Sequence, residues 1–294
     1  MMKSGLINVL KPPGMTSHDV VAFVRRLYGI KRVGHAGTLD PAAAGVLPVF
    51  IGNATRLVEY LADADKSYRA ELTFGFETDT GDDTGQIINS HPYTRPNLRQ
   101  IEEVLASFIG VSEQIPPMYS AIKIGGKKLY ELARAGQVVE RKPRKIVIDD
   151  LSLVTESETG IVFDVTCSKG TYIRTLCADI GHRLNCLAVM SFLVRTRVGS
   201  FCLEQSLTLE EIAANKEQAV QNADNVLTHI PAIFLSEQES QALKNGRSIC
   251  CVKSGADLLK IYDYQKNFIG IGREICQSED HATLTPVKIL SPDR

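Results

Sequence analysis

The sequence has no apolar run long enough to span a membrane, and its first residues lack a long apolar segment ending in a small-residue cleavage site. It also lacks any C-x-x-C pair. Its seven cysteines are odd in number and scattered from Cys167 to Cys276, so neither a disulfide framework nor a zinc site has the spacing that it needs. We therefore expect a cytoplasmic protein without membrane contact, in which most cysteines are buried as small apolar side chains.

The sequence also has almost no net charge, −1 at pH 7, which would argue against a nucleic-acid partner if the charges were evenly spread. They are not. Residues 121–145 hold eight lysines and arginines against two glutamates, whereas residues 204–239 hold seven acidic residues against Lys216. Such segregation places a positive surface on a neutral protein, as phosphate binding requires. A solvated basic face without a partner is the alternative interpretation.

The length of 294 residues, with 44% apolar and 23% charged residues, is typical of a globular protein with one large and one small domain. The segment 220–225 is typical of a linker, and the residues from Ile230 onward form a second compositional unit. We predict an α+β fold: a mixed, largely antiparallel sheet with flanking helices over 1–228, and a small β-rich domain over 229–294. Apolar spacing predicts four helices, over 17–28 with Ser17 as its N-cap, over 55–61, over 97–108, and from the 168–174 segment to 184. It predicts strands over 46–51, 67–74, 145–153, 161–167 and 189–198.

The rest of the chain is arranged around residues 34–45, Gly-His-Ala-Gly-Thr-Leu-Asp-Pro-Ala-Ala-Ala-Gly. Its glycines let the backbone bend and let another group approach closely. Pro41 biases Asp40 toward an extended conformation, so that the carboxylate is placed on a loop of defined shape. A simple turn is the commoner outcome for such a segment, and a catalytic loop is the sharper hypothesis.

Residues 77–83 carry four acidic side chains and a glycine, but they lack the ligand register of a helix–loop–helix calcium site. We therefore expect an acidic, solvated turn there. The sequence offers no other group of residues with the spacing of a metal site. The sequence therefore indicates no metal site.

Four separated blocks resemble the TruB family of RNA-modifying pseudouridine synthases, in the family's order and over about residues 5–205. Ala44 departs from the pattern, since bacterial members usually have a threonine there. The region after 229 resembles the family's small RNA-binding PUA domain in position and size. The four blocks are Lys-Pro-Pro-Gly-Met-Thr-Ser (11–17), the 34–45 loop, Pro-Pro-Met-Tyr-Ser-Ala (116–121) with Gly-Lys-Lys-Leu-Tyr (126–130), and Cys-Ser-Lys-Gly-Thr-Tyr-Ile-Arg (167–174).

The resemblance implies an isomerase that converts the uridine at position 55, in the T loop of tRNA, to pseudouridine. Because that reaction oxidises nothing and adds no group, the resemblance also implies neither a cofactor nor a metal. Asp40 is then the nucleophile on a flipped-out base, and Arg174 is the opposite charge that keeps its carboxylate ionised. From the residues alone, Arg174 could equally be a phosphate-binding arginine at a helix start. Whether Asp40 attacks the sugar carbon or the uracil ring, or assists elimination, stays open.

The resemblance also assigns substrate-binding residues. Tyr68, which is also expected to act in catalysis near C5, and Tyr172 are the aromatic residues of the uridine pocket, and Leu193 is an apolar residue of the same pocket. His35 is expected to fill the space that the base leaves, with a general base as the alternative. Lys11 and the basic 121–145 segment are expected to hold the RNA backbone. Without the resemblance, the two tyrosines and Leu193 would be interpreted as ordinary core.

We expect the partner to be the tRNA T stem-loop, bound by a monomer without guide RNA or membrane. Two rival hypotheses stay open. One is a non-catalytic RNA-binding or RNA-folding factor on the same scaffold. The other is a dyskerin-like, guide-RNA-dependent subunit, although the chain lacks extra basic tails for such an assembly.

Overall fold

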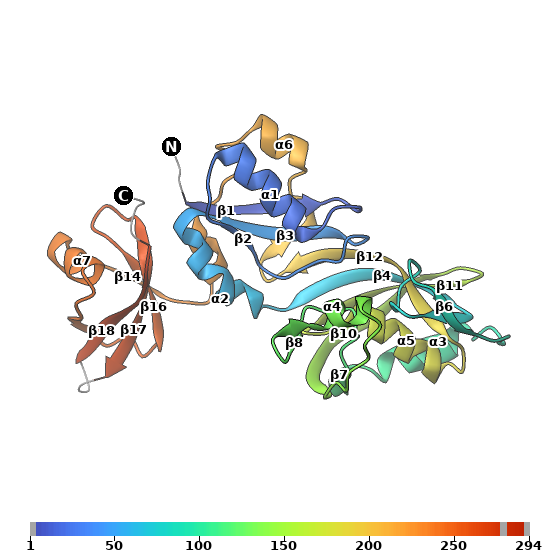
Figure 1. Cartoon of the computed structure of the whole chain (residues 1–294). Coiled ribbons are helices and arrows are strands. Elements are labelled where there is room, and N and C mark those ends of the chain that lie inside the picture. Colours follow the sequence, from blue (N-terminus) through green and yellow to red (C-terminus); the bar gives the residue numbers. More distant parts are fainter. Residues whose placement is uncertain (1–3, 277–280, 291–294) are drawn as a thin grey trace.

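The computed structural model describes residues 4–276 and 281–290. Its larger unit is built on a central sheet that curves through the middle of the molecule (Figure 1). Strands β12 and β3 run parallel, and all other neighbours in the sheet order are antiparallel, which confirms the expected mixed, largely antiparallel sheet. The sheet order is β1 (Gly5–Lys11), β3 (Ala44–Ile51), β12 (Ala188–Val198), β4 (Lys66–Phe74), β11 (Gly160–Cys167), β10 (Arg144–Glu156) and β7 (Gly110–Gln114), with β2 (Val33–His35) on β3 and β13 (Phe201–Cys202) on β12.

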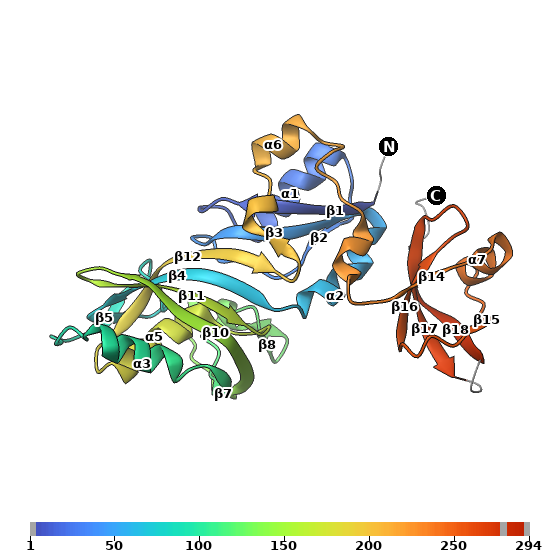
Figure 2. The ribbon, with the colours of Figure 1, turned by 180° about the vertical axis from the view of Figure 1, so that it is seen from behind.

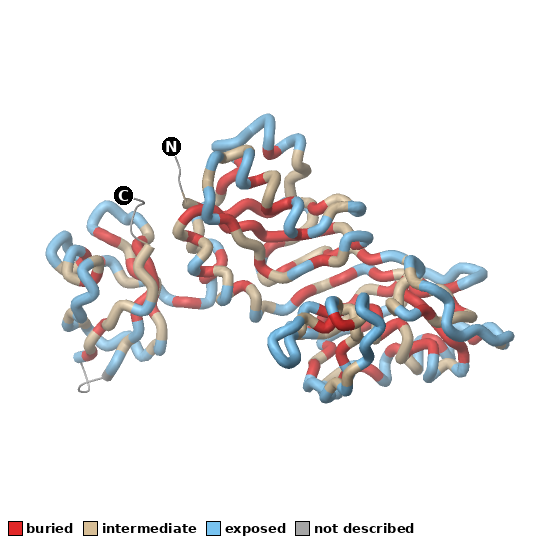
Figure 3. The backbone as a smooth tube through the Cα atoms, in the orientation of Figure 1, coloured by how far each residue is buried: buried red, intermediate tan, exposed pale blue. Residues whose placement is uncertain are grey.

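Helices cover the sheet at its two ends, and Figures 1 and 2 show the same grouping from opposite sides. Near β1 and β3 lie α1 (Ser17–Tyr28) and α6 (Leu209–Ala214), whose apolar side chains form a core with Ile7, Leu47 and Val49. Near β10, β11 and β12 lie α3 (Leu98–Ala106) and α5 (Ile173–Arg183). Buried residues accordingly follow the strands of the sheet in Figure 3.

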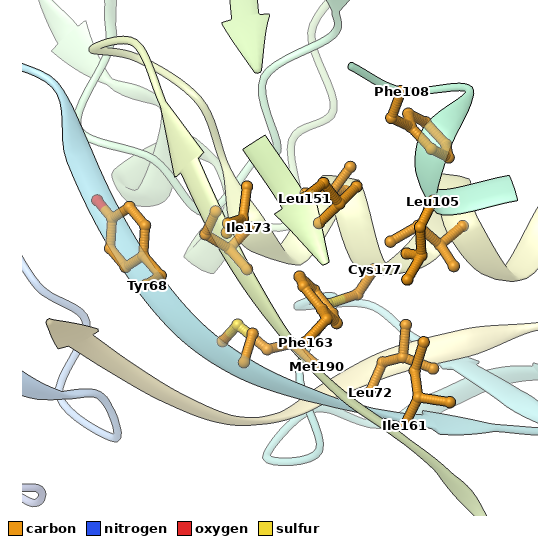
Figure 4. Close-up of a cluster of buried hydrophobic side chains, with 14 of the residues drawn as sticks. Tyr68, Leu72, Leu105, Phe108, Leu151, Ile161, Phe163, Ile173, Cys177 and Met190 are labelled. Atoms are coloured by element: carbon orange, nitrogen blue, oxygen red, sulfur yellow. The ribbon is translucent and has the colours of Figure 1, made fainter. Parts of the chain in front are cut away.

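The second core lies between α3, α5 and the strands β4, β10, β11 and β12 (Figure 4). Phe163 and Leu72 are fully buried at its centre. Tyr68 stands at one end of the cluster, and its hydroxyl points away from the other labelled side chains. This end of the core is where β4 passes the loop between β2 and β3.

The start of α1 differs from the expectation at one residue. Thr16, not Ser17, is the N-cap: its hydroxyl accepts from the backbone N–H of Asp19, whose carboxylate accepts in return from the N–H of Thr16. This reciprocal pair satisfies two N–H groups that a helix start leaves free. Ser17 is thus released from capping and is buried against the loop that follows β2.

The expected linker at 220–225 is also different in the structure. Val220 is buried, and Gln221 and Leu6 exchange backbone hydrogen bonds of 2.7 and 3.0 Å. The segment is therefore packed along β1, because its apolar residue and its amide groups find partners there. A short 3-10 helix, Ala223–Leu227, follows it.

The C-terminal part forms a separate sheet beside α2 (Val58–Ala62), in the order β14 (Ala232–Phe234), β16 (Leu258–Tyr262), β17 (Phe268–Cys276), β18 (His281–Ile289) and β15 (Ile249–Val252), with α7 (Glu237–Lys244) packed against it. Hydrogen bonds join it to the larger unit. Arg56 donates to the carbonyl of Ile289 at 2.6 Å, Lys288 pairs with Glu59, and the Tyr262 hydroxyl donates to Asp224 at 2.5 Å.

The remaining elements lie outside the two large sheets. The expected helix over 55–61 is a 3-10 helix, Gly52–Leu57, that continues into α2. No helix in the two described ranges combines the length and the apolar character needed to cross a membrane. The other short elements are the hairpin β5 (Phe76–Thr78) and β6 (Ile87–Ser90), the hairpin β8 (Lys123–Ile124) and β9 (Lys127–Lys128), helix α4 (Leu129–Arg134) and the 3-10 helix Leu203–Gln205.

Candidate active site

Asp40 lies on the loop that joins β2 to β3, and buried polar groups hold this loop in place. The ammonium of Lys11, at the end of β1, donates to the carbonyl oxygens of Pro12 at 2.9 Å, Pro41 at 3.2 Å and Ala43 at 2.6 Å. Burial lowers the pKa of Lys11 from 10.5 to about 8. The Lys11 side chain is fully buried and its protons point at carbonyl oxygens, so in this structure it does not reach solvent, where the expected contact with the RNA backbone would take place. It holds the backbone that follows Asp40.

Two further residues fix the part of the loop that precedes Asp40. The Ser17 hydroxyl donates to the carbonyl of Leu39 at 3.2 Å and accepts from the N–H of Leu39 at 3.0 Å. Arg195, on β12, donates to the carbonyls of Gly37 at 3.1 Å and Thr38 at 3.5 Å. Gly37 has φ +89°, a backbone conformation that favours glycine, and its carbonyl accepts the hydrogen bond from Arg195 at this bend of the loop.

The structure brings Asp40 and Arg174 together, although they are far apart in the sequence. The Nε atom of Arg174 lies 3.0 Å from an Asp40 carboxylate oxygen, and its other nitrogens donate to the carbonyls of Thr80 at 2.7 Å and Tyr119 at 2.6 Å. The Arg174 side chain is only 7% exposed, whereas that of Asp40 is 41% exposed. With all three nitrogens engaged, Arg174 is placed to orient Asp40 rather than to bind a phosphate.

The acidic turn at 77–83 keeps its four carboxylate residues half-buried or exposed, as expected, but it also packs against Arg174. Asp82 accepts hydrogen bonds from the hydroxyls of Thr80 and Thr84 at 2.7 and 2.6 Å, and this closed turn presents the Thr80 carbonyl to Arg174. A Cβ on Gly81 would lie 3.5 Å from that of Arg174. The carboxylates thus shape a turn that positions the arginine.

The start of α5 is held from outside the helix. The side-chain amide of the buried Gln114, at the end of β7, accepts from the N–H of Tyr172 at 2.8 Å and donates to its carbonyl at 3.1 Å. Tyr172 precedes the helix, and Arg174 is in its first turn. The anchor therefore sets the position of both residues relative to the loop.

A cavity of 310 Å³ opens between the Asp40 loop, β4, β12 and the start of α5. The resemblance to the family selects seven side chains, and five of them line this cavity: Asp40, Tyr68, Tyr172, Arg174 and Leu193. Burial raises the pKa of Tyr68, so its hydroxyl is protonated at neutral pH. The lining residues are Gly37, Thr38, Leu39, Asp40, Ala62, Lys66, Tyr68, Tyr119, Ser120, Ala121, Lys169, Gly170, Thr171, Tyr172, Ile173, Arg174, Met190, Leu193 and Arg195.

His35 and Lys11 are outside that lining. The half-buried His35 ring makes an edge-on contact with His18, with 5.8 Å between ring centres, and its Nδ1 atom is buried without a hydrogen-bond partner. Burial lowers the pKa of His35, with His18 and Arg195 adding to the effect, so the ring is neutral at pH 7. A neutral, flat ring suits stacking as well as proton transfer.

The basic segment begins at the mouth of this cavity. Ser120 and Ala121 line the cavity, and the hairpin β8–β9 and α4 follow. Lys123, Lys127 and Arg134 are exposed on these elements, as are Lys142, Arg144 and Lys145 beyond them. The segment thus places positive charge in solvent next to the opening. No group of three or more potential metal ligands occurs within the residues that the structure describes.

The sequence patterns do not select several contributors to the site, among them Thr80, Tyr119, Gln114, Lys66 and Arg195. Thr80 and Tyr119 contribute backbone carbonyls, which every residue has, so no residue type identifies them. Lys66 is the first residue of β4, and Arg195 lies in β12. Both strands carry further charged residues, so a charge on the strand does not by itself identify these two, and their burial is the property that separates them.

Comparison with known proteins identifies the family of this chain. Residues 25–173 match the family described as TruB family pseudouridylate synthase (N terminal domain), 174–231 match tRNA pseudouridylate synthase B C-terminal domain, and 231–281 match Pseudouridine synthase II TruB, C-terminal. The tRNA pseudouridine synthase B of Caldanaerobacter subterraneus subsp. tengcongensis is 50% identical over 92% of this chain and 95% of that protein. That of Bacillus subtilis is 46% identical over 83% of each.

Among solved structures, one titled as a Cbf5-Nop10-Gar1 complex contains a chain that superposes with a TM-score of 0.75 at 27% identity. The superposition covers 99% of this chain and 86% of that one. The likeness therefore includes both the central sheet and the C-terminal sheet.

Proposed function

Because the chain belongs to the TruB family of pseudouridylate synthases, we propose that it isomerises the uridine at position 55, in the T loop of tRNA, to pseudouridine, with Asp40 as the nucleophile. One observation carries the proposal. The Asp40 carboxylate is held by Arg174 at 3.0 Å and lines a cavity of 310 Å³ together with Tyr68 and Tyr172. This arrangement offers an oriented anion to a planar ligand that enters between aromatic side chains.

The reaction breaks the bond between uracil N1 and the sugar carbon C1′, joins C5 to C1′ and moves a proton from C5 to N1. Nothing is oxidised and no group is added, so neither a metal nor a cofactor is needed. A carboxylate can stabilise the developing positive charge on the sugar or bond covalently to it, as in glycoside cleavage. Arg174 keeps the Asp40 oxygens in one orientation through that step.

The two tyrosines and Leu193 hold the base. Tyr68 is buried on β4 and Leu193 on β12, whereas Tyr172 stands at the start of α5. Stacking of a base on such side chains contributes about 1–3 kcal/mol per base. The Tyr68 hydroxyl points away from the core cluster, and we place it near C5, whose proton must leave (Figure 4).

The target base must leave its stack to reach Asp40, at a cost of a few kcal/mol. We assign His35 to the vacated space, because it lies outside the cavity on the same loop segment and its ring is neutral. The exposed cations of the 121–145 segment bind the RNA backbone beside the cavity mouth. The protein acts as a monomer in the cytoplasm, without guide RNA.

The proposal is tested with a bare tRNA transcript labelled with tritium at C5 of its uridines. We expect release of one equivalent of tritium by the purified chain alone, and none from a transcript in which position 55 is cytidine. Binding without release would favour the RNA-folding alternative. Release that requires added protein or RNA would favour the guide-dependent one.

A further inference from the structure

Two cations on the cavity wall have no part in the mechanism above. Lys66, at the start of β4, is 7% exposed, and Arg195, on β12, is 1% exposed; both line the cavity. Within the described part of the chain, neither has a carboxylate at ion-pair distance. Buried charges are ordinarily paired with an opposite charge, so these two lack a partner that proteins usually supply.

Their hydrogen bonds leave donors unused. The Lys66 ammonium has three protons and donates to two carbonyls, those of Ala62 at 3.0 Å and Ala64 at 2.6 Å. Arg195 has five donors. Its bonds to the carbonyls of Val46, Thr38 and Gly37 use three, and it also forms a hydrogen bond with the Tyr68 hydroxyl. The carbonyls are neutral acceptors, so the net positive charge remains.

The two side chains converge at the Asp40 loop. A Cβ on Gly37 would lie 3.4 Å from both Arg195 Nη1 and Lys66 Cε. Arg195 also faces Tyr68 across the strand pair β12–β4. Burial, with Arg195 adding to it, lowers the pKa of Lys66 from 10.5 to about 8, which shows how unfavourable the charge is without an anion.

The other cations of the cavity are engaged. Arg174 is bonded to Asp40 and two carbonyls, and Lys169 at the mouth pairs with Asp63 at 2.8 Å. Among the described residues that line the cavity, Lys66 and Arg195 are therefore cations with donors left over and no carboxylate partner. A nucleotide that places its C1′ at Asp40 brings its own phosphates into this region, because they belong to the same residue of the RNA.

We propose that Lys66 and Arg195 form a phosphate subsite for the backbone phosphate that flanks the extruded uridine, with Lys66 donating to a phosphate oxygen and Arg195 supplying charge beneath it. This inference rests on the proposed function. Under the proposed subsite, a backbone phosphate of the substrate, in addition to the base, fixes how deeply the nucleotide enters the cavity. Binding there uses an anion that a free uracil base does not carry.

The test replaces one phosphate at a time by an uncharged methylphosphonate in a T-arm stem-loop RNA, on either side of the target uridine. Single-turnover tritium release against enzyme concentration gives a half-saturating concentration for wild type, Lys66→Met and the control Lys216→Met, which removes an exposed lysine outside the cavity. A charged hydrogen bond of this kind is worth about tenfold or more in binding.

We expect one of the two methylphosphonates to raise the half-saturating concentration about tenfold for wild type and Lys216→Met, and less than about twofold for Lys66→Met. Lys66→Arg keeps the positive charge, so we expect the methylphosphonate still to raise its half-saturating concentration. This variant is measured as well, in case Lys66→Met does not fold. An equal penalty in wild type and Lys66→Met, or no penalty at either phosphate in wild type, would overturn the subsite. Absence of release from the unmodified RNA would instead refute the proposed function.

Discussion

At the scale of single residues, the Arg174 guanidinium links three parts of the chain. It touches the Asp40 loop, the acidic turn through Thr80 and the 116–121 segment through Tyr119. Because the guanidinium is planar and always charged, it can make these contacts at fixed angles. The residue thus joins three segments of the chain, in addition to the role that we propose for it in orienting Asp40.

Arg174→Met is expected to lower the free energy of unfolding by about 3 kcal/mol, because it leaves two carbonyls and a carboxylate without their donor. Denaturant unfolding measures this change. The matched control is Arg69→Met, which removes an exposed pair with Asp164 that has good geometry at 2.7 Å. That loss is expected to stay within about 1 kcal/mol. Equal losses in the two variants would contradict the assignment.

Lys11 predicts a pH dependence of stability. Its pKa is lowered from 10.5 to about 8 in the folded protein, so between these values the unfolded chain binds a proton that the folded chain has lost. Stability from this group therefore rises with pH across that window. Relative to Lys11→Met, wild type is expected to gain roughly 1–3 kcal/mol in unfolding free energy from pH 8 to 10.

The measurement for Lys11 is denaturant unfolding of both proteins at matched pH values, because their difference removes the titration of other groups. Lys66→Met provides a second comparison, since the pKa of Lys66 is lowered to the same range. A difference between wild type and Lys11→Met that is flat or falls from pH 8 to 10 would show that Lys11 is not buried as a cation.

At the scale of elements, α1 and the Asp40 loop are joined through two adjacent residues with separate tasks. Thr16 caps the helix, and the buried Ser17 hydroxyl both donates to and accepts from Leu39. The loop is therefore fixed to the first turn of a helix that packs on β1 and β3. Rigid support of this kind keeps a catalytic group within its productive geometry.

Ser17→Ala and Thr16→Ala separate these tasks. Thr16→Ala is expected to cost about 1 kcal/mol of stability with little effect on the rate of tritium release, because it removes only a cap. Ser17→Ala is expected to cost about 1–3 kcal/mol and to slow single-turnover release at saturation by at least about tenfold, because the loop loses a buried anchor. Similar release rates in the two variants would contradict the role of Ser17.

The elements also show how far the sequence could be interpreted. The helix over 17–28 and the strands over 46–51 and 161–167 were predictable because apolar spacing records which face is buried. The fixed turn at 77–83 was not predictable, because its partner Arg174 lies about 90 residues away and contacts it through a carbonyl. The resemblance to the family selects the pocket residues Asp40 and Tyr68, whereas none of the four motif blocks includes Lys66.

At the scale of the whole molecule, charge is distributed so that a chain with net charge −1 can bind a polyanion. The exposed cations after residue 121 stand next to the cavity mouth, and the buried cations stand inside it. The C-terminal sheet is joined to the larger unit beside α2, at Arg56, Glu59 and Lys288. These contacts hold the C-terminal sheet against the larger unit, which contains the cavity.

This distribution predicts the salt dependence of tRNA binding. The logarithm of the affinity should fall linearly with the logarithm of the salt concentration, and removal of Lys127 or Lys145 by substitution with methionine should reduce the slope by about one per lost phosphate contact. Lys216→Met, on an acidic part of the chain, should leave the slope unchanged. Filter binding over a range of salt concentrations measures all three, and equal slopes in all variants would contradict a role of the 121–145 segment.

We propose that one oriented carboxylate carries the chemistry, and the variant Asp40→Asn removes the charge of that group while nearly keeping its shape. Tritium release from C5-labelled tRNA is measured for wild type, Asp40→Asn and the control Asp63→Asn, which changes an exposed carboxylate at the cavity mouth. We expect Asp40→Asn to show no release above background and a tRNA affinity within about threefold of wild type, and we expect near-normal release for Asp63→Asn. Release by Asp40→Asn within about tenfold of wild type would contradict the proposal.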